Sequence, residues 1–202
     1  MAIDHFQEHY YQKGRVDWNF NVVFNGQADV ERMLREYAPL LDHPGLYPPI
    51  PLQWLHATVL RVGLLEDFTE QEMLTVAEAL APKLAKLQLP EFVFDSWWMW
   101  GGSVCLHITP HDQFSLIYDC VIEAMQAVVG KERTLLTPHG QFMPHSTLAY
   151  TKSHHQEREI HKKLSESLIK PAAFDVSSVA LIKQKPINGR YEWEVVKDVR
   201  IG

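Results

Sequence analysis

The apolar residues of this sequence recur with two spacings, every second residue in some segments and every third or fourth in others. Alternate spacing is typical of a strand with one buried face, and the longer spacing indicates an amphipathic helix. Strands are predicted at 17–25, about 52–63, 91–100, 103–109, about 144–151, from about 173, 176–187 and 190–200. Helices are predicted at about 29–41, 69–87, 110–130 and 153–170.

Several element boundaries carry their own signals. Thr69 and Glu72 form a capping-box pattern at the start of the second helix. Thr109-Pro110 is expected to cap the third helix, because proline is favoured in a first helical turn. The fourth helix is expected to begin at Ser153 and to bury a narrow apolar stripe of Ile160, Leu164 and Leu168. Asn188-Gly189 predicts a two-residue hairpin turn between the last two strands.

The order of elements repeats along the chain. Each half has the pattern strand–helix–strand–helix–strand, and the third element of each half contains a His-x-Thr sequence. We therefore expect a duplicated α+β fold, in which antiparallel sheets of two lobes face a central cleft and helices cover the outer faces. The 202 residues would form a single bilobal domain, with lobes at about 1–100 and 101–202.

Composition narrows the classes of partner. The net charge of -6 argues against a broad electrostatic grip on duplex nucleic acid, although a small phosphorylated ligand or a nucleic-acid end remains compatible. The two cysteines, Cys105 and Cys120, have neither metal-ligand spacing nor a disulfide framework. Because no segment resembles a signal peptide or a membrane span, we expect a cytoplasmic protein without membrane association.

The two His-x-Thr segments are the candidate chemistry. Residues i and i+2 of a strand point to the same face, so His56 lies beside Thr58 and His145 lies beside Thr147. Histidine titrates near neutral pH, so one imidazole can accept a proton from water while the other donates one to a leaving oxygen. The threonine hydroxyls can donate hydrogen bonds to phosphoryl oxygens. This pattern predicts phosphoester cleavage by a general acid and a general base, with no metal and no cofactor.

A third copy, His107-Ile108-Thr109, shows that one such motif is a weak signal in a chain with 11 histidines. It is followed by Pro110, and Thr109 is better explained as a helix cap. The alternative for His56 and His145 is that both are ordinary strand histidines that bond nearby carbonyls. Their occurrence in matching strands of two similar halves favours the catalytic interpretation.

Together these segments resemble the two-histidine (2H) phosphoesterase superfamily, and within it the 2′-5′ RNA ligase-like proteins. The resemblance rests on residues 55–63 and 144–150. It implies hydrolysis of 2′,3′-cyclic phosphates on RNA ends or nucleotides to 2′-phosphates, with 2′-5′ RNA joining as a side activity. It favours His56 as acid and His145 as base, although the symmetry of the two halves leaves this assignment open.

Three further residues are candidates for substrate binding. In the family, the position five residues after each motif histidine often carries a residue near the phosphate, frequently arginine in the second motif; here these positions hold Arg61 and Tyr150. Strict alternation would turn both away from the histidines, so a bulge late in each strand is required. Trp54 shares the predicted face of His56 and could stack on a nucleobase. Asn19 and Asn21 share a face of the first strand and could line the cleft.

Two rival functions stay open at this stage. One is a non-catalytic module of the same fold that binds nucleotides or RNA ends. The other is a metal-dependent hydrolase that uses some of the other histidines. Under the favoured interpretation the partner is an RNA end or a cyclic nucleotide as substrate, and we expect a monomer with no obligate protein partner.

Overall fold

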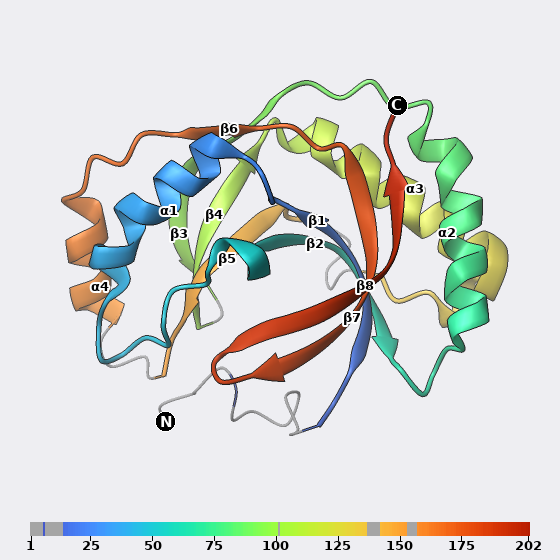
Figure 1. The fold of residues 1–202 in the computed structure, drawn as a ribbon, viewed down its shortest axis with the longest axis horizontal. Coiled ribbons are helices and arrows are strands. Elements are labelled where there is room, and N and C mark those ends of the chain that lie inside the picture. The colour runs from blue at the N-terminus through green and yellow to red at the C-terminus, as the bar shows by residue number, and fades with distance from the viewer. Residues whose placement is uncertain (1–5, 7–13, 101, 137–141, 153–156) are drawn as a thin grey trace.

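Two four-stranded antiparallel sheets form the frame of the molecule (Figure 1). The structure, a computed structural model, describes Phe6 and residues 14–100, 102–136, 142–152 and 157–202. In order, the first sheet contains β2 (His56–Leu64), β1 (Asp17–Val23), β7 (Ser178–Ile187) and β8 (Arg190–Arg200). The second contains β5 (His145–Tyr150), β4 (Ser103–Thr109), β3 (Phe92–Trp100) and β6 (Ala172–Phe174). The predicted two-lobed α+β fold is confirmed.

The sheets do not follow the predicted lobe boundary at residue 100. Strand β3 pairs with β4 and so belongs to the second sheet, although it was expected to complete the first lobe. The β7–β8 hairpin pairs through β7 with β1 and so belongs to the first sheet, although it was expected to end the second lobe. The last strand of the first half is therefore in the second sheet, and the last hairpin of the second half is in the first sheet. Local hydrophobic spacing cannot reveal this exchange.

The helices are exchanged between the sheets as well. Helix α1 (Ala28–Leu41) follows β1 in the chain, yet it contacts β6 of the second sheet and packs beside α4 (Glu157–Ser165). Helix α3 (His111–Val129) follows β4, yet it packs along α2 (Glu70–Leu84) and contacts β2 of the first sheet. In Figure 1, α1 and α4 accordingly lie together at one end and α2 and α3 at the other. None of the helices in the described part of the chain combines the length and the hydropathy that a membrane-spanning helix requires.

An aromatic cluster joins the two halves in the core. Phe24, just after β1, contacts Phe94 of β3 at 5.1 Å and Phe174 of β6 at 4.9 Å between ring centroids. All three rings are buried. Removing a buried phenylalanine ring typically costs about 3–5 kcal/mol, so this cluster is a major link between the first strand and the second sheet.

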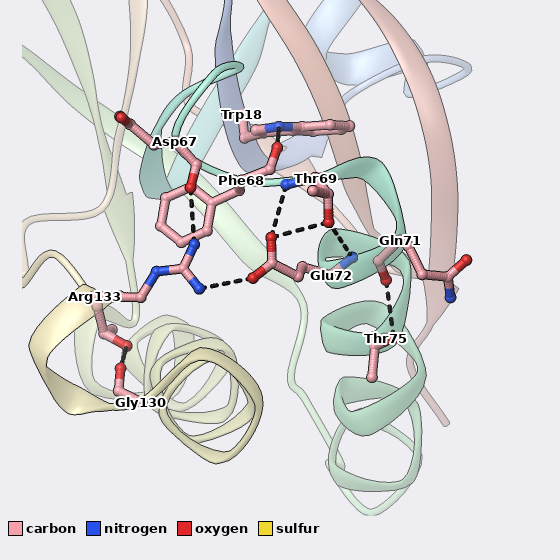
Figure 2. A network of polar contacts seen from close by, with 10 residues as sticks. Trp18, Asp67, Phe68, Thr69, Gln71, Glu72, Thr75, Gly130 and Arg133 are labelled. Atoms are coloured by element: carbon pink, nitrogen blue, oxygen red, sulfur yellow. Dashed lines mark hydrogen bonds and ion pairs between the residues drawn. The ribbon is translucent and has the colours of Figure 1, made fainter.

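The start of α2 is fixed by a polar network shown in Figure 2. The Thr69 hydroxyl accepts from the Glu72 backbone N–H at 3.2 Å, and the Glu72 carboxylate accepts from the Thr69 backbone N–H at 2.8 Å. Arg133, in the short 3-10 helix η3 (Lys131–Arg133), adds a 2.7 Å bond to Glu72 and lies over the Phe68 ring. The predicted capping box is confirmed, and Arg133 fastens the segment after α3 to it.

Some predicted boundaries were wrong. The segment expected as one strand at 52–63 is divided into a 3-10 turn, η2 (Leu52–Trp54), and β2. Helix α3 has Pro110 at its N-cap position, whereas the Thr109 hydroxyl donates to Asp95 at 3.1 Å, so Thr109 is not a helix cap. The expected start of the fourth helix at Ser153 lies outside the described residues.

The end of the fourth helix also differs from the prediction. Helix α4 ends at Ser165, and Leu168, the third member of the predicted stripe, is 98% exposed. Ile160 and Leu164 are buried as predicted. The hairpin turn is confirmed, with positive φ values of 49° at Asn188 and 82° at Gly189 that these two residues tolerate.

Candidate active site

The two His-x-Thr strands meet at the centre of the molecule. Strands β2 and β5 are each at the edge of their own sheet, and the Ser146 hydroxyl of β5 donates to the His56 carbonyl of β2 at 2.8 Å. A cavity of about 150 Å³ opens between them. Its lining residues are Asp17, Asn19, His56, Thr58, Arg61, His145, Thr147, Tyr150, Gln184 and Tyr191. The structure therefore brings both predicted His-Thr pairs into one cavity.

The two imidazoles are held in the same way. The Nδ1 atom of His56 lies 3.0 Å from the Trp54 carbonyl oxygen, and that of His145 lies 2.7 Å from the Met143 carbonyl oxygen. A carbonyl oxygen can only accept, so Nδ1 carries the proton in both rings. In the neutral form Nε2 then has the lone pair, and it is the nitrogen suited to proton transfer. In both strands, the backbone carbonyl of the residue two positions before the histidine therefore fixes the tautomer of the ring.

Burial disfavours the charged form of both rings. It lowers the pKa of His56 to about 4, with the Trp54 hydrogen bond acting in the opposite direction and the charge of His145 adding to the decrease. Burial also lowers the pKa of His145, against the effect of the Met143 hydrogen bond and with a contribution from His107. Both imidazoles are therefore neutral in the empty site near pH 7, and a bound phosphate anion would favour their protonation.

The hydroxyl partners lie on the same face as the histidines. Thr58 pairs with Asn21 of β1, and Thr147 pairs with Cys105 of β4, whose Sγ is 3.7 Å from the Thr147 hydroxyl. Both threonines line the cavity. This arrangement places one imidazole and one hydroxyl on each side of the space where a ligand would bind.

A bulge in each strand returns the fifth position to this face. Between Thr58 and Leu60, Val59 has no partner in the β1 register, and between Thr147 and Ala149, Leu148 has none in the β4 register. An extra residue reverses the alternation of side chains beyond it. Arg61 and Tyr150 consequently line the cavity with the histidines, through the kind of bulge that the sequence required.

The two fifth-position residues have different surroundings. The Arg61 Nη2 atom is 3.3 Å from both carboxylate oxygens of Asp17, which also accepts from Arg15 Nε at 3.0 Å. Tyr150 is buried, and its ring meets the Phe6 ring at 4.9 Å and the Tyr191 ring at 5.7 Å. One side of the cavity therefore carries a cation held by a carboxylate, and the other carries a phenol held by aromatic packing.

Trp54 does not reach this cavity. Because it belongs to the 3-10 turn rather than to β2, its ring packs against Trp193 at 5.0 Å, and Trp193 in turn packs against His56 at 4.7 Å. Trp54, expected as a substrate-binding residue, is therefore not among the residues that line the cavity. Trp193, supplied by the C-terminal hairpin, is the tryptophan that contacts His56.

Three lining residues, Asp17, Gln184 and Tyr191, were not predicted from the sequence. Asn19, which was expected as a residue that could line the cleft, does line the cavity. Asp17 shares the alternation of Asn19, so the sequence did contain a signal for it. Gln184 and Tyr191 come from the hairpin, whose position beside β1 depends on long-range strand pairing. Asn21 is buried outside the cavity and donates to Gln184 at 3.2 Å.

The third His-x-Thr sequence, residues 107–109, lies beside the second His-x-Thr strand. His107 is directly opposite His145 in the β4–β5 pairing, and its Nδ1 is 3.5 Å from the Asp95 carboxylate. It is not among the residues that line the cavity. Within the described ranges no cluster of three or more His, Cys, Asp or Glu side chains is arranged to hold a metal ion.

The fold and the cavity define a two-lobed protein with paired His-x-Thr strands at its centre. The model of the family described as the 2′-5′ RNA ligase superfamily matches residues 28–187, and the chain belongs to this superfamily. The resemblance drawn from the two short segments is thereby confirmed. Among curated proteins no sequence matches the chain.

Solved structures share the fold at low sequence identity. TT0787 of Thermus thermophilus is 18% identical, with a TM-score of 0.65 over 92% of this chain and 97% of that one. LigT of E. coli complexed with 3'-AMP is 15% identical, with a TM-score of 0.62 over 93% and 98% of the two chains. A phosphoesterase is 16% identical, with a TM-score of 0.61 over 93% and 98%.

Proposed function

We propose that the protein hydrolyses 2′,3′-cyclic phosphodiesters, on RNA ends or nucleotides, to 2′-phosphates. The observation that carries this proposal is the matched presentation of two imidazoles, each with Nδ1 tied to a backbone carbonyl and each beside a threonine in one cavity. Superfamily membership and the likeness to LigT, which has been crystallised with 3'-AMP, support a nucleotide-type ligand.

The reaction follows from this geometry. One imidazole accepts a proton from water through Nε2 as the water oxygen attacks phosphorus, and the bond between phosphorus and the 3′ oxygen breaks. The second imidazole, protonated, gives its proton to the departing 3′ oxygen. Each role typically contributes about 10²–10⁴-fold in rate. The family resemblance gives the acid role to His56 and the base role to His145.

The remaining lining groups stabilise the phosphoryl charge. The hydroxyls of Thr58 and Thr147 can donate to non-bridging oxygens from opposite sides of the cavity, and the Arg61 guanidinium supplies a positive charge. Arg61 is held by Asp17, so its position is set before the substrate enters. With these donors the reaction needs no metal ion. The same type of step, with a 5′-hydroxyl in place of water as the nucleophile and the 3′ oxygen again leaving, would form a 2′-5′ linkage.

The deciding experiment is an assay of adenosine 2′,3′-cyclic monophosphate hydrolysis in EDTA, with products separated by chromatography. We expect adenosine 2′-monophosphate as the product, and we expect the rate to fall by about 10²–10⁴-fold in H56A and in H145A. Binding without turnover would support the non-catalytic module instead. Loss of activity in EDTA that a divalent ion restores would support the metal-dependent hydrolase.

A further inference from the structure

Two tryptophans of β3, Trp98 and Trp100, lie on the side of the second sheet that faces the cavity, next to His145. Trp98 is paired with Cys105, which is paired with Thr147, and Trp100 is paired with Ser103, which is paired with Tyr150. Residues directly opposite one another in antiparallel strands point to the same side of the sheet. Both indoles are therefore on the side that carries the histidine, threonine and tyrosine of this half of the cavity.

The rings lie close to the second histidine. The ring centroid of Trp100 is 6.0 Å from that of His145, and the ring centroid of Trp98 is 6.3 Å from it. The cyclic phosphate in the cavity would be bonded to a ribose, and the nucleobase is attached to the same ribose. A nucleobase is thus within one sugar ring of these indoles when the phosphate contacts His145.

Trp100 is also exposed in a way that buried packing does not explain. Its exposed fraction is 63%, and among the exposed large apolar side chains of the described ranges it is the one aromatic residue. An exposed apolar patch is more informative than a single exposed side chain, and Trp100 forms such a patch with Trp98, 6.3 Å away between ring centroids, next to His145. Trp98 is half-buried and fixes the inner edge of this surface.

The tryptophans near His56 are arranged differently. Trp193 packs edge-to-face against both Trp54 and His56, with interplanar angles of 86° and 76°. Both indoles are half-buried in this closed cluster. An exposed indole therefore lies on the His145 side of the cavity and not on the His56 side.

We infer that Trp100, supported by Trp98, stacks on the nucleobase of the substrate and makes the site selective for a nucleoside phosphate over a simple cyclic phosphate ester. The inference rests on the proposed function for its substrate. Stacking on an aromatic side chain is tolerant of base identity, because every base has a π face. The surface therefore selects for the presence of a base rather than for one particular base.

The test compares two substrates that differ only in the base. Adenosine 2′,3′-cyclic monophosphate has one, and the 2,3-cyclic phosphate of methyl ribofuranoside has none. In W100L we expect kcat/KM for the nucleoside substrate to fall by about 5- to 150-fold, the equivalent of about 1–3 kcal/mol per stacked base, with no change for the sugar substrate. W98L should show a smaller effect of the same kind, and W100F should retain most of the wild-type preference.

The matched control is W97L on the same strand. Trp97 points to the opposite face of β3, where its ring contacts His161 at 5.1 Å, so its replacement should not alter the preference for a base. Equal losses on both substrates in W100L, or a base-dependent loss in W54L instead, would overturn the inference. Circular dichroism and thermal melting of each variant separate such losses from unfolding.

A binding measurement keeps this test independent of catalysis. Calorimetry compares adenosine 2′-monophosphate with the 2-phosphate of methyl ribofuranoside on the wild type and on W100L. If the protein binds the nucleotide more tightly and W100L abolishes only that advantage, the stacking surface stands even where no hydrolysis is found. If the wild type binds both phosphates equally, the inference fails while the proposed hydrolysis can still hold.

Discussion

Strands β2 and β5 follow the same backbone path toward the cavity, but they carry different side chains. Both begin with a histidine whose Nδ1 donates to the carbonyl two residues earlier, and both place a threonine beside it. Both then add one unpaired residue that returns the fifth position to the cavity. The duplicated feature is therefore the path of the backbone, and this path gives the two histidines their matched geometry.

The strands differ in what this path presents. On the β2 side Arg61 brings a charge that Asp17 holds in place, whereas on the β5 side Tyr150 brings a phenol within an aromatic cluster. The β5 side also has Trp98 and Trp100 next to its histidine. Under the proposed function the phosphate lies between the two strands; the β2 side adds the cation that binds it, and the β5 side adds the surface that stacks on the base.

The largest expected effect tests whether the two histidines are equivalent. We expect H56A and H145A each to lower kcat by about 10²–10⁴-fold, because each removes one proton-transfer step. The double variant should be little worse than either single one, since residues that act as a unit are not additive. Steady-state hydrolysis of adenosine 2′,3′-cyclic monophosphate measures this.

The control for these variants is H161A, on the exposed side of α4, which should keep wild-type activity. A loss below about tenfold in either catalytic variant would break the equivalence of the two strands. Such a result would mean that a single histidine is enough for the reaction, so the matched geometry of the other strand would need another explanation.

The next effect separates the two fifth positions. We expect R61M to lower kcat/KM by about 10- to 150-fold, because a hydrogen bond to a charged group contributes about 1.5–3 kcal/mol. Asp17 keeps Arg15 as a partner in this variant, so its carboxylate is not left alone. Y150F removes only a neutral hydroxyl and should cost about 10-fold or less. Equal losses in the two variants would contradict the assignment of the phosphate-binding charge to the β2 side.

The pH dependence of kcat/KM probes the free site. The rate requires one neutral and one protonated histidine, so it rises as the base loses its proton and falls as the acid loses its own. The pKa of His56 is about 4 and that of His145 is also lowered, so both limbs lie on the acidic side of the ordinary histidine value. We expect a bell-shaped profile with its maximum below about pH 6.5. A rate that rises steadily from about pH 5 to pH 9 would contradict the acid–base pair.

The variant W193L tests which limb of the pH profile belongs to the histidine of β2. Trp193 packs on His56 and not on His145, so W193L should expose the first imidazole alone. Because burial is the main cause of the low pKa of His56, that limb should move toward neutral pH while the other stays in place. A shift of both limbs together would show that the two rings titrate as one coupled unit.

The smallest effect concerns the position after each histidine. Ser146 donates across the lobes to the His56 carbonyl, whereas its counterpart on β2, Ala57, has no hydroxyl. S146A should lower the free energy of unfolding by about 1 kcal/mol, the usual net value of such a bond, as measured by urea denaturation. The substitution removes a single oxygen atom, so a large cavity does not add to this cost. No change in stability would show that the lobes are held together by other contacts.

Local patterns in the sequence predicted most of the elements and the two His-Thr pairs that line the cavity. The capping box at Thr69, the Asn188-Gly189 turn and both His-x-Thr strands depend on residues close in the chain. The need for bulges before Arg61 and Tyr150 also followed from strict alternation. The family was identified from two short segments, residues 55–63 and 144–150.

Long-range pairing accounts for what could not be predicted. Gln184 and Tyr191 enter the cavity because the hairpin joins β1, and Trp193 replaces Trp54 beside His56 for the same reason. The periodicity of a segment shows which of its faces is buried, but it does not show which sheet or helix covers that face. For this reason the sequence did not predict the exchange of strands and helices between the lobes.

This exchange has a consequence for assembly. A chain cut between β3 and β4 would yield two fragments, each with strands of both sheets and with one helix that belongs against the other fragment's strands. Neither fragment could shield its apolar surfaces alone, so each should aggregate when made separately and regain solubility when the two are mixed. The two similar halves of the chain are thus interlocked and are not independent modules. The two histidines can face one cavity only when the whole chain has folded.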